Sequence, residues 1–240
     1  MKKKLVLFDL DGTLLPMDQD EYTKAYFMVL LKKLAGFGLP AQTPEEQKAL
    51  GKAVWSGTYA MLQNDGTCTN EERFFSVFNA LTGVDLSHKK AELEVFYQNE
   101  FNQVSVVSSK NPLIPQVLER LKANGYRVAI ATNPLFPLAA NGSRLAWAGL
   151  SLEDFEYCTC YENSRYCKPN LDYYRDILNH LGVSAEECIM VGNDVNDDMV
   201  VRELGMDVFL VTDCLINADN KDINDYPHGS FADFVEFMGI

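Results

Sequence analysis

The sequence has few basic side chains and no long apolar run. Lys and Arg number 21 against 34 Asp and Glu, which gives a net charge of −13 at pH 7. A chain this acidic repels nucleic acids, and no stretch clusters Lys or Arg with aromatic residues to offset that charge. No segment approaches the roughly 20 apolar residues that are needed to cross a bilayer. We therefore expect neither a nucleic-acid partner nor a membrane anchor.

The sequence also lacks paired cysteine motifs and a secretory leader. Its six cysteines form no CxxC pair, and 240 residues can bury a core without disulfides, so reduced thiols are expected. The basic start is followed by an apolar run that covers only residues 5–8 before Asp9 interrupts it. Such a run is too short for a signal peptide. We therefore expect a cytoplasmic protein.

What the sequence does contain is a set of short apolar segments that end in polar residues. Four are pronounced, and a fifth is weaker. They cover residues 4–11, 126–133, 187–194, 206–213 and, for the weaker fifth, 155–162. Runs of this kind are typical of parallel strands that are buried on both faces. Helical patterns alternate with them from about residue 112 to 213, which predicts a doubly wound, mainly parallel α/β sheet.

Residues 16–108 differ from the rest, because four helical patterns follow one another there with Gly- or Pro-containing loops between them. Little in this stretch alternates as a strand would. The sequence therefore predicts two domains. One is an α/β core of residues 1–15 and 109–240, and the other is a smaller all-helical domain of residues 16–108 inserted into it.

Polar side chains that can take part in catalysis or ligand binding follow three of the predicted strands. Asp9 and Asp11 end the first, Thr132 and Asn133 end the second, and Asp194 ends the third. Ligands of open α/β sheets bind at the carboxyl ends of the strands, so these residues are expected to meet. One site is therefore predicted from segments that lie far apart in the chain.

Asp9 and Asp11 are two positions apart in an extended segment, so both side chains point toward the same side of the strand end. Gly12 then permits a turn or a close approach that a side chain would block. A strand that is simply capped by turn-forming aspartates is the alternative interpretation. The four apolar residues before Asp9, and Thr13 after the glycine, disfavour it.

Three more acids, Asp194, Asp197 and Asp198, lie where the third strand turns into a predicted helix. Acids in a first helical turn complement the helix dipole, and that role is sufficient for Asp197. If Asp194 also meets Asp9 and Asp11, three carboxylates within several ångströms repel one another unless a cation compensates them. Oxygen ligands together with a phosphate-type substrate favour Mg²⁺ over zinc.

Lys168 precedes Pro169, a residue that suits the first position of a helix, so the lysine is expected at a helix N-terminus. A cation there opposes the helix dipole, and a bound anion such as phosphate would compensate it. A solvated surface lysine is the alternative.

Taken together, these residues resemble the four signature motifs of the haloacid dehalogenase (HAD) superfamily. The motifs are LVLFDLDGTLL with Asp9 and Asp11, AIATN with Thr132, CKP with Lys168, and VGNDVNDD with Asp194 and Asp198. The resemblance spans residues 4 to about 212 in order and implies a Rossmann-like core. The longest gap lies between the first two motifs, where members of this superfamily carry a helical cap that closes over the site.

The resemblance also implies roles in phosphoryl transfer. Asp9 is the expected nucleophile, which forms an aspartyl-phosphate, and Asp11 is the expected general acid and then base. Thr132 and Asn133 would bind phosphoryl oxygens, and Lys168 would bind substrate and neutralise Asp9.

For the metal, the resemblance implies that Mg²⁺ is held by the Asp9 side chain, the Asp11 backbone carbonyl and Asp194, while Asp198 supports the metal shell. Such an arrangement suits phosphoryl transfer, in which positioning and charge neutralisation supply most of the catalysis.

The activity implied is Mg²⁺-dependent hydrolysis of a small organic phosphate monoester, since a closing cap admits small substrates. A phosphomutase that acts on a sugar phosphate uses the same site and stays an alternative. Dehalogenases lack the second aspartate, so Asp11 argues against that activity. A phospho-accepting signalling receiver is less favoured, because such a module would be much shorter than this chain and its phosphorylated aspartate would not precede the other acids on the first strand. A binding module that has lost catalysis is less favoured because every expected reactive group is present. The pattern fixes neither the substrate nor the oligomeric state.

Overall fold

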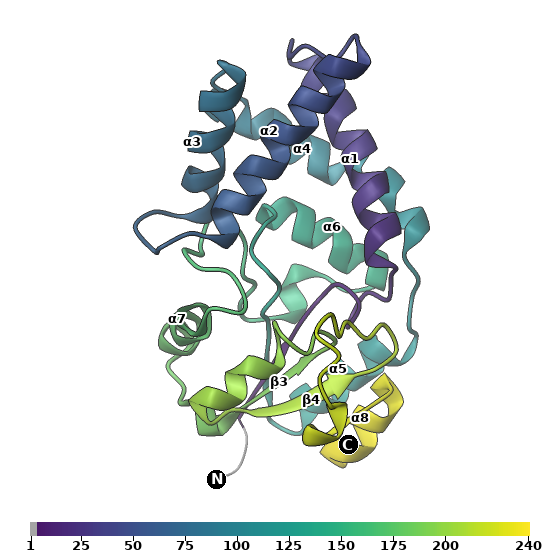
Figure 1. Cartoon of the computed structure of the whole chain (residues 1–240). Coiled ribbons are helices and arrows are strands. Elements are labelled where there is room, and N and C mark those ends of the chain that lie inside the picture. Colours follow the sequence, from purple (N-terminus) through teal and green to yellow (C-terminus); the bar gives the residue numbers. More distant parts are fainter. Residues whose placement is uncertain (1–3) are drawn as a thin grey trace.

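The computed structural model in Figure 1 describes residues 4–240. One parallel sheet forms its base, with the strand order β2-β1-β3-β4-β5. The strands are β1 (Leu5–Phe8), β2 (Arg127–Ile130), β3 (Cys188–Gly192), β4 (Asp207–Val211) and β5 (His228–Gly229). The first four coincide with the four pronounced apolar segments, and the predicted α/β fold is confirmed.

Helices connect the strands. The α-helices are α1 (Gln19–Gly36), α2 (Pro44–Leu62), α3 (Asn70–Thr82), α4 (Lys90–Gln98), α5 (Leu113–Ala123), α6 (Leu138–Ala148), α7 (Leu171–Leu181) and α8 (Phe231–Met238). Short 3₁₀ helices are η1 (Ser87–Lys89), η2 (Glu100–Val107), η3 (Leu152–Asp154), η4 (Ala185–Glu187), η5 (Met199–Leu204) and η6 (Ile223–Asp225). None of the helices within residues 4–240 combines the length and the apolar composition that a membrane span requires.

The sheet is buried on both faces, which explains why β1 is apolar throughout instead of alternating. Val6 and Phe8 belong to an apolar cluster with side chains of α5 and α8. Leu5 and Leu7 point the other way, into a second cluster with side chains of α7 and η5. Helices therefore cover both faces, as a doubly wound sheet requires.

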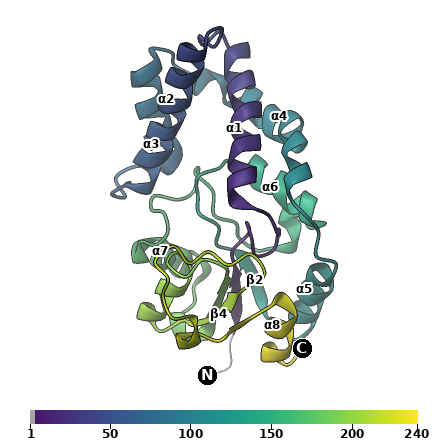
Figure 2. The ribbon, with the colours of Figure 1, turned by 45° about the vertical axis from the view of Figure 1, so that its right-hand side comes forward.

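Helices α1 to α4 lie together beyond one end of the sheet, whereas α5, which also precedes β2, packs against the sheet. Figures 1 and 2 show α1 to α4 grouped there, with α6 between them and the strands. The two crossings into this helical insertion run side by side, because Met17 pairs with Ser108 and the Ser109 N–H donates to the Pro16 carbonyl at 2.9 Å. The helices predicted for residues 16–108 are confirmed. The division into two domains stays a prediction.

The prediction of a weaker fifth strand over residues 155–162 is wrong, because no strand of the sheet lies there. Only Cys158 forms a bridge there, to Ile130 of β2. The segment runs beside β2 for only a few residues: the Glu156 N–H donates to the Val128 carbonyl at 3.0 Å and the Ile130 N–H donates to the Tyr157 carbonyl at 2.8 Å. After that, side-chain amides take the carbonyls, since Asn163 donates to Cys158 O at 2.9 Å and Asn141 donates to Thr159 O at 2.8 Å. The strand that completes the sheet is β5, close to the C-terminus, on the opposite edge.

Candidate active site

The turn that follows β1 holds Asp9 at the carboxyl end of this strand. The Asp9 N–H donates to the Val191 carbonyl at 2.9 Å, so the β1–β3 pairing extends one residue past Phe8. Gly12 then turns the chain with a φ of +82°, and a side chain there would collide with the Asn193 amide. This position therefore requires glycine both for its backbone angle and for its space.

Lys168 lies between two carboxylates. Its Nζ donates to Asp9 Oδ1 at 2.8 Å and to Asp198 Oδ1 at 2.6 Å, and its side chain is 2% exposed. Burial alone would lower the pKa of this ammonium group, but Asp198 and Asp9 outweigh burial and hold the pKa well above its usual value. Lys168 therefore keeps a positive charge against Asp9.

The expectation that Lys168 lies at a helix N-terminus is wrong, as is the alternative of a surface lysine. Helix α7 begins at Leu171, and the Asn170 side chain caps it by accepting from the Asp172 N–H at 2.9 Å. Pro169 precedes the helix and is not its first residue. The charge of Lys168 is compensated by two buried carboxylates within the protein.

The carboxylate of Asp198 is itself held in a fixed position. Its Oδ2 accepts from the Asp194 N–H at 2.9 Å, and Gly192 provides the space, since a side chain there would collide with the carboxylate. Burial raises the pKa of Asp198 to about 7, although the Lys168 charge acts in the opposite direction. The contacts of Asp198 thus fix Lys168, and its predicted support of a metal shell stays a prediction.

Asp197 reaches further into the site than a helix-dipole role requires. Its Oδ2 accepts from Asn133 Nδ2 at 3.3 Å, so it contacts the loop that follows β2. Burial raises the pKa of Asp197 to about 6, with Lys168 opposing and the charges of Asp194 and Asp9 adding to the rise. The segment after β3 is a turn followed by the 3₁₀ helix η5, where the sequence predicts an α-helix.

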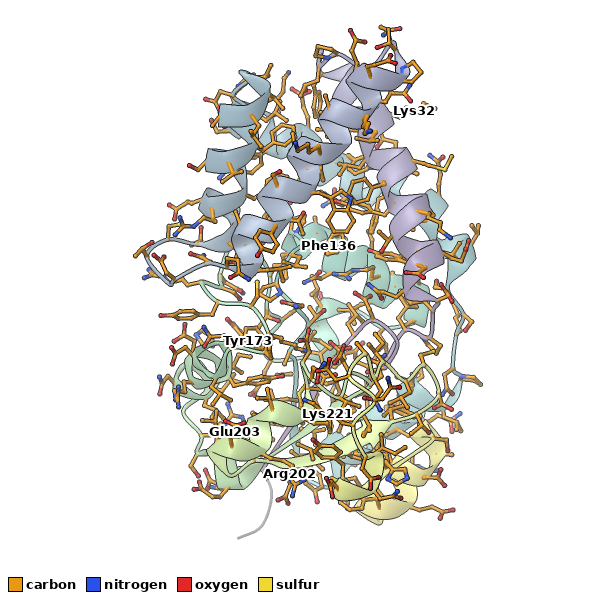
Figure 3. All side chains as sticks on the ribbon, viewed as in Figure 1. Lys32, Phe136, Tyr173, Arg202, Glu203 and Lys221 are labelled. Carbon is orange, nitrogen blue, oxygen red and sulfur yellow. The ribbon has the colours of Figure 1, made fainter. Side chains whose placement is uncertain are left out.

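The loop after β2 is fixed through its backbone. The Thr132 carbonyl accepts from Thr159 Oγ1 at 2.7 Å and from the Tyr173 hydroxyl at 2.8 Å. Figure 3 shows Tyr173 extending from α7 into the molecule. Thr132 itself is buried, 3% exposed, at the end of the strand next to β1. The loop therefore holds Thr132 and Asn133 beside the Asp9 strand end, as the sequence predicts.

The helical insertion contacts two of these loops through Asn70, which is fully buried. Its Nδ2 donates to the Pro134 carbonyl at 3.2 Å and to Cys167 Sγ at 3.3 Å. The Asn64 amide in turn donates to Asn70 Oδ1 at 2.8 Å. Sequence reasoning missed this residue. A signal exists, because Thr69 already caps α3 and leaves the side chain of Asn70 free for another partner.

Asp11 forms an ion pair with Nη1 of Arg144, a residue of α6 that sequence reasoning also missed. The Arg144 side chain is 0% exposed, and its guanidinium lies 4.3 Å from the centre of the Phe136 ring. Figure 3 places Phe136 between the helical insertion and the sheet. Burial raises the pKa of Asp11, while the Arg144 charge acts to lower it.

The oxygen atoms of Asp9, Asp194 and the Asp11 backbone carbonyl suit a divalent cation. Asp9 and Asp194 follow the adjacent strands β1 and β3, and Asp9 Oδ2 has a long 3.4 Å contact with the Thr13 hydroxyl. Within residues 4–240 no group of three or more His, Cys, Asp or Glu side chains could hold a metal ion, so the expected gathering of three carboxylates is not formed. Two carboxylates and the Asp11 carbonyl are still hard oxygen donors that suit Mg²⁺. This ligand assignment stays a prediction.

Comparisons with known proteins agree with this geometry. A family model described as haloacid dehalogenase-like hydrolase matches residues 3–205. The glyceraldehyde 3-phosphate phosphatase of Methanothermobacter thermautotrophicus is 25% identical over 222 residues, which cover 92% of this chain and 90% of that protein. The phosphoglycolate phosphatase of Aquifex aeolicus is 24% identical over 236 residues, which cover 98% and 96%.

The fold is also found among solved structures. A HAD phosphatase from Thermococcus onnurineus aligns with a TM-score of 0.61 over 100% of this chain and 98% of its own, at 19% identity. A likeness at this identity shows a shared fold and leaves the substrate undetermined.

Proposed function

The chain belongs to the haloacid dehalogenase-like hydrolase family, and from this premise we propose that it hydrolyses small organic phosphate monoesters through an aspartyl-phosphate on Asp9, with Mg²⁺ as its metal ion. The predicted family and enzyme class are confirmed, and the phosphatase names of the relatives support a phosphoric monoester hydrolase. The proposal includes a cytoplasmic location and a helical cap of residues 16–108 on the core.

The observation that carries the proposal is the position of Lys168 between Asp9 and Asp198, at 2.8 and 2.6 Å. A carboxylate nucleophile must stay ionised and must approach a phosphoryl group that is itself negative. A buried ammonium in contact with Asp9 meets both needs, because charges interact more strongly where water is excluded. A purely structural ion pair would need one carboxylate, whereas here the second one holds the cation in place.

In the proposed reaction, an Asp9 oxygen attacks phosphorus while the bond to the leaving-group oxygen breaks, and Asp11 gives that oxygen a proton. Water then attacks the aspartyl-phosphate, Asp11 takes its proton, and phosphate leaves with Asp9 restored. Thr132 and Asn133 bind the phosphoryl oxygens, and Lys168 stays on Asp9 throughout. A cation held by Asp9, the Asp11 carbonyl and Asp194 would supply further charge stabilisation.

The test is phosphate release from a panel of metabolite phosphates, with Mg²⁺ or with EDTA, by the wild type and by Asp9→Asn. We expect Asp9→Asn to lower turnover by about 10³ or more, because no covalent intermediate can form. The matched control is Asp172→Asn, the same change in an exposed pair with Arg175, which should retain activity. Normal turnover by Asp9→Asn, or full activity in EDTA, would overturn the mechanism.

The same panel separates the phosphatase from a phosphomutase, which would use the same residues. A phosphatase releases inorganic phosphate in proportion to the substrate consumed. An isomerised sugar phosphate without free phosphate would identify the mutase instead.

A further inference from the structure

Arg144 is a buried cation for which the proposed reaction has no use. Its side chain is 0% exposed, and α6, on which it lies, carries none of the four motifs. Nη1 forms the ion pair with Asp11, and Nη2 donates to Asn141 Oδ1, one turn earlier on the same helix. A fully buried arginine beside a proposed catalytic carboxylate calls for an account of what it does there.

The contacts of Arg144 fix the direction of its donors. The guanidinium is planar and rigid, so the Phe136 ring at 4.3 Å from its centre and the Asn141 oxygen at Nη2 together define its orientation. The direction of Nη1, and with it the position of Asp11 Oδ2, follows from these two anchors. A lysine in the same place could supply the charge but not the direction.

The other oxygen of Asp11 is left free. Asp11 Oδ1 is buried and has no hydrogen-bond partner among the described residues. A buried oxygen without a partner costs free energy, and such groups are rare in folded proteins unless they serve a function. An Asp11 carboxylate with Oδ2 fixed and Oδ1 unengaged has one oxygen ready for proton exchange.

We propose that Arg144 is the positioning residue for proton transfer by Asp11: it holds Oδ2 so that Oδ1 faces the leaving-group oxygen and afterwards the attacking water. The inference rests on the proposed phosphatase function. In the first step the Oδ1 proton passes to the leaving-group oxygen as the P–O bond breaks. In the second step the same oxygen receives a proton from water.

Proton donation matters in proportion to the basicity of the leaving group. An alkoxide leaves poorly without a proton, whereas 4-nitrophenolate is a stable anion and leaves without one. Loss of Arg144 should therefore slow the first step selectively for alkyl phosphates. An arginine that only packs the core would affect both substrates alike.

The experiment measures the rate of leaving-group release in the first turnover, together with kcat and KM, for 2-glycerophosphate and 4-nitrophenyl phosphate with Mg²⁺. The proteins are the wild type, Arg144→Met, Arg144→Lys, Asp11→Asn and the Asp11→Asn/Arg144→Met double variant. In the first turnover we expect Arg144→Met to slow leaving-group release from 2-glycerophosphate by about 10–100-fold and from 4-nitrophenyl phosphate by less than about threefold. Hydrolysis of the aspartyl-phosphate, which is common to both substrates, should slow equally. Arg144→Lys should show the same selectivity with a smaller loss. In the Asp11→Asn background, Arg144→Met should cause no further loss, since both changes remove one function.

Equal losses on the two substrates in the first turnover, or losses that multiply in the double variant, would overturn the role of Arg144. Should Arg144→Met fail to fold by circular dichroism, Arg144→Lys keeps the buried charge and tests the same role through its substrate selectivity. Failure of the proposed function looks different, because Asp9→Asn would then hydrolyse 4-nitrophenyl phosphate like the wild type.

Discussion

Two sides of this site can be compared directly, because Asp9 and Asp11 are two positions apart on one segment and each meets a buried cation. On the Lys168 side, one ammonium group faces the two carboxylates of Asp9 and Asp198. On the Arg144 side, one guanidinium faces the single carboxylate of Asp11. The Lys168 side therefore has one more acidic group than basic groups, whereas the Arg144 side pairs one with one.

The different surroundings of Asp9 and Asp11 show how one short motif can serve two chemical roles. A local excess of negative charge is where a further cation binds most readily, in line with the Mg²⁺ proposed beside Asp9. A balanced pair attracts no further ion and instead fixes geometry. Lysine suits the first side as a compact charge, and arginine suits the second because its donors have fixed directions.

The largest effect that would test this comparison is expected from Lys168→Met. It removes the charge beside the nucleophile, so kcat should fall by about 10³ for 2-glycerophosphate and for 4-nitrophenyl phosphate alike. The pattern contrasts with that expected for Arg144→Met, which depends on the leaving group. A loss confined to the alkyl substrate would mean that Lys168 acts on the leaving group and not on the nucleophile.

The same variant should also unfold more easily. Asp9 and Asp198 would remain buried without their cation, which is expected to cost about 3–5 kcal/mol of the free energy of unfolding. Lys122→Met is the matched control, because Lys122 pairs with Asp154 at 3.3 Å on the surface and should contribute less than about 1 kcal/mol. Urea unfolding of both variants measures the difference, and equal stabilities would contradict a buried pair.

A smaller effect is expected from Asn70→Ala, which removes side-chain hydrogen bonds between the helical insertion and the Lys168 side. The Pro134 carbonyl and the Asn64 amide lose a buried partner, so we expect a loss of about 1–3 kcal/mol in the free energy of unfolding. Because Cys167 precedes Lys168, kcat should fall for both substrates. Asn79→Ala on the same helix removes a bond to Asp85 within the insertion and should leave kcat unchanged. A normal kcat for Asn70→Ala would show that this contact is only structural.

The Lys168 side can be predicted from the sequence for a physical reason. The carboxyl ends of parallel strands all lie on the same side of the sheet. Residues that follow β1, β2 and β3 must therefore lie near one another, however far apart they are in the chain. This rule locates Asp9, Thr132 and Asn133. It does not reveal the partners of Lys168, because the burial of that lysine depends on Asp198 and on the space left by Gly192.

The Arg144 side cannot be predicted in this way, because it depends on how α6 is oriented against the β1 loop. In the sequence, Arg144 lies among small and apolar residues of a helix, where an arginine is usually exposed. Its spacing from Asn141, three positions earlier, is the only local trace of the contact. Tertiary packing decides such a case. It also ends the pairing of residues 156–159 with β2, because the Asn163 and Asn141 amides take the Cys158 and Thr159 carbonyls.

The most direct test of the central claim is the mass spectrum of Asp11→Asn quenched in acid during turnover of 4-nitrophenyl phosphate with Mg²⁺. This variant should form the aspartyl-phosphate but hydrolyse it slowly, since the base for water is missing. We expect one phosphoryl group on the peptide that contains Asp9, and none when Asp9→Asn is added. Phosphate release with no label on that peptide, or with a label on another residue, would contradict it.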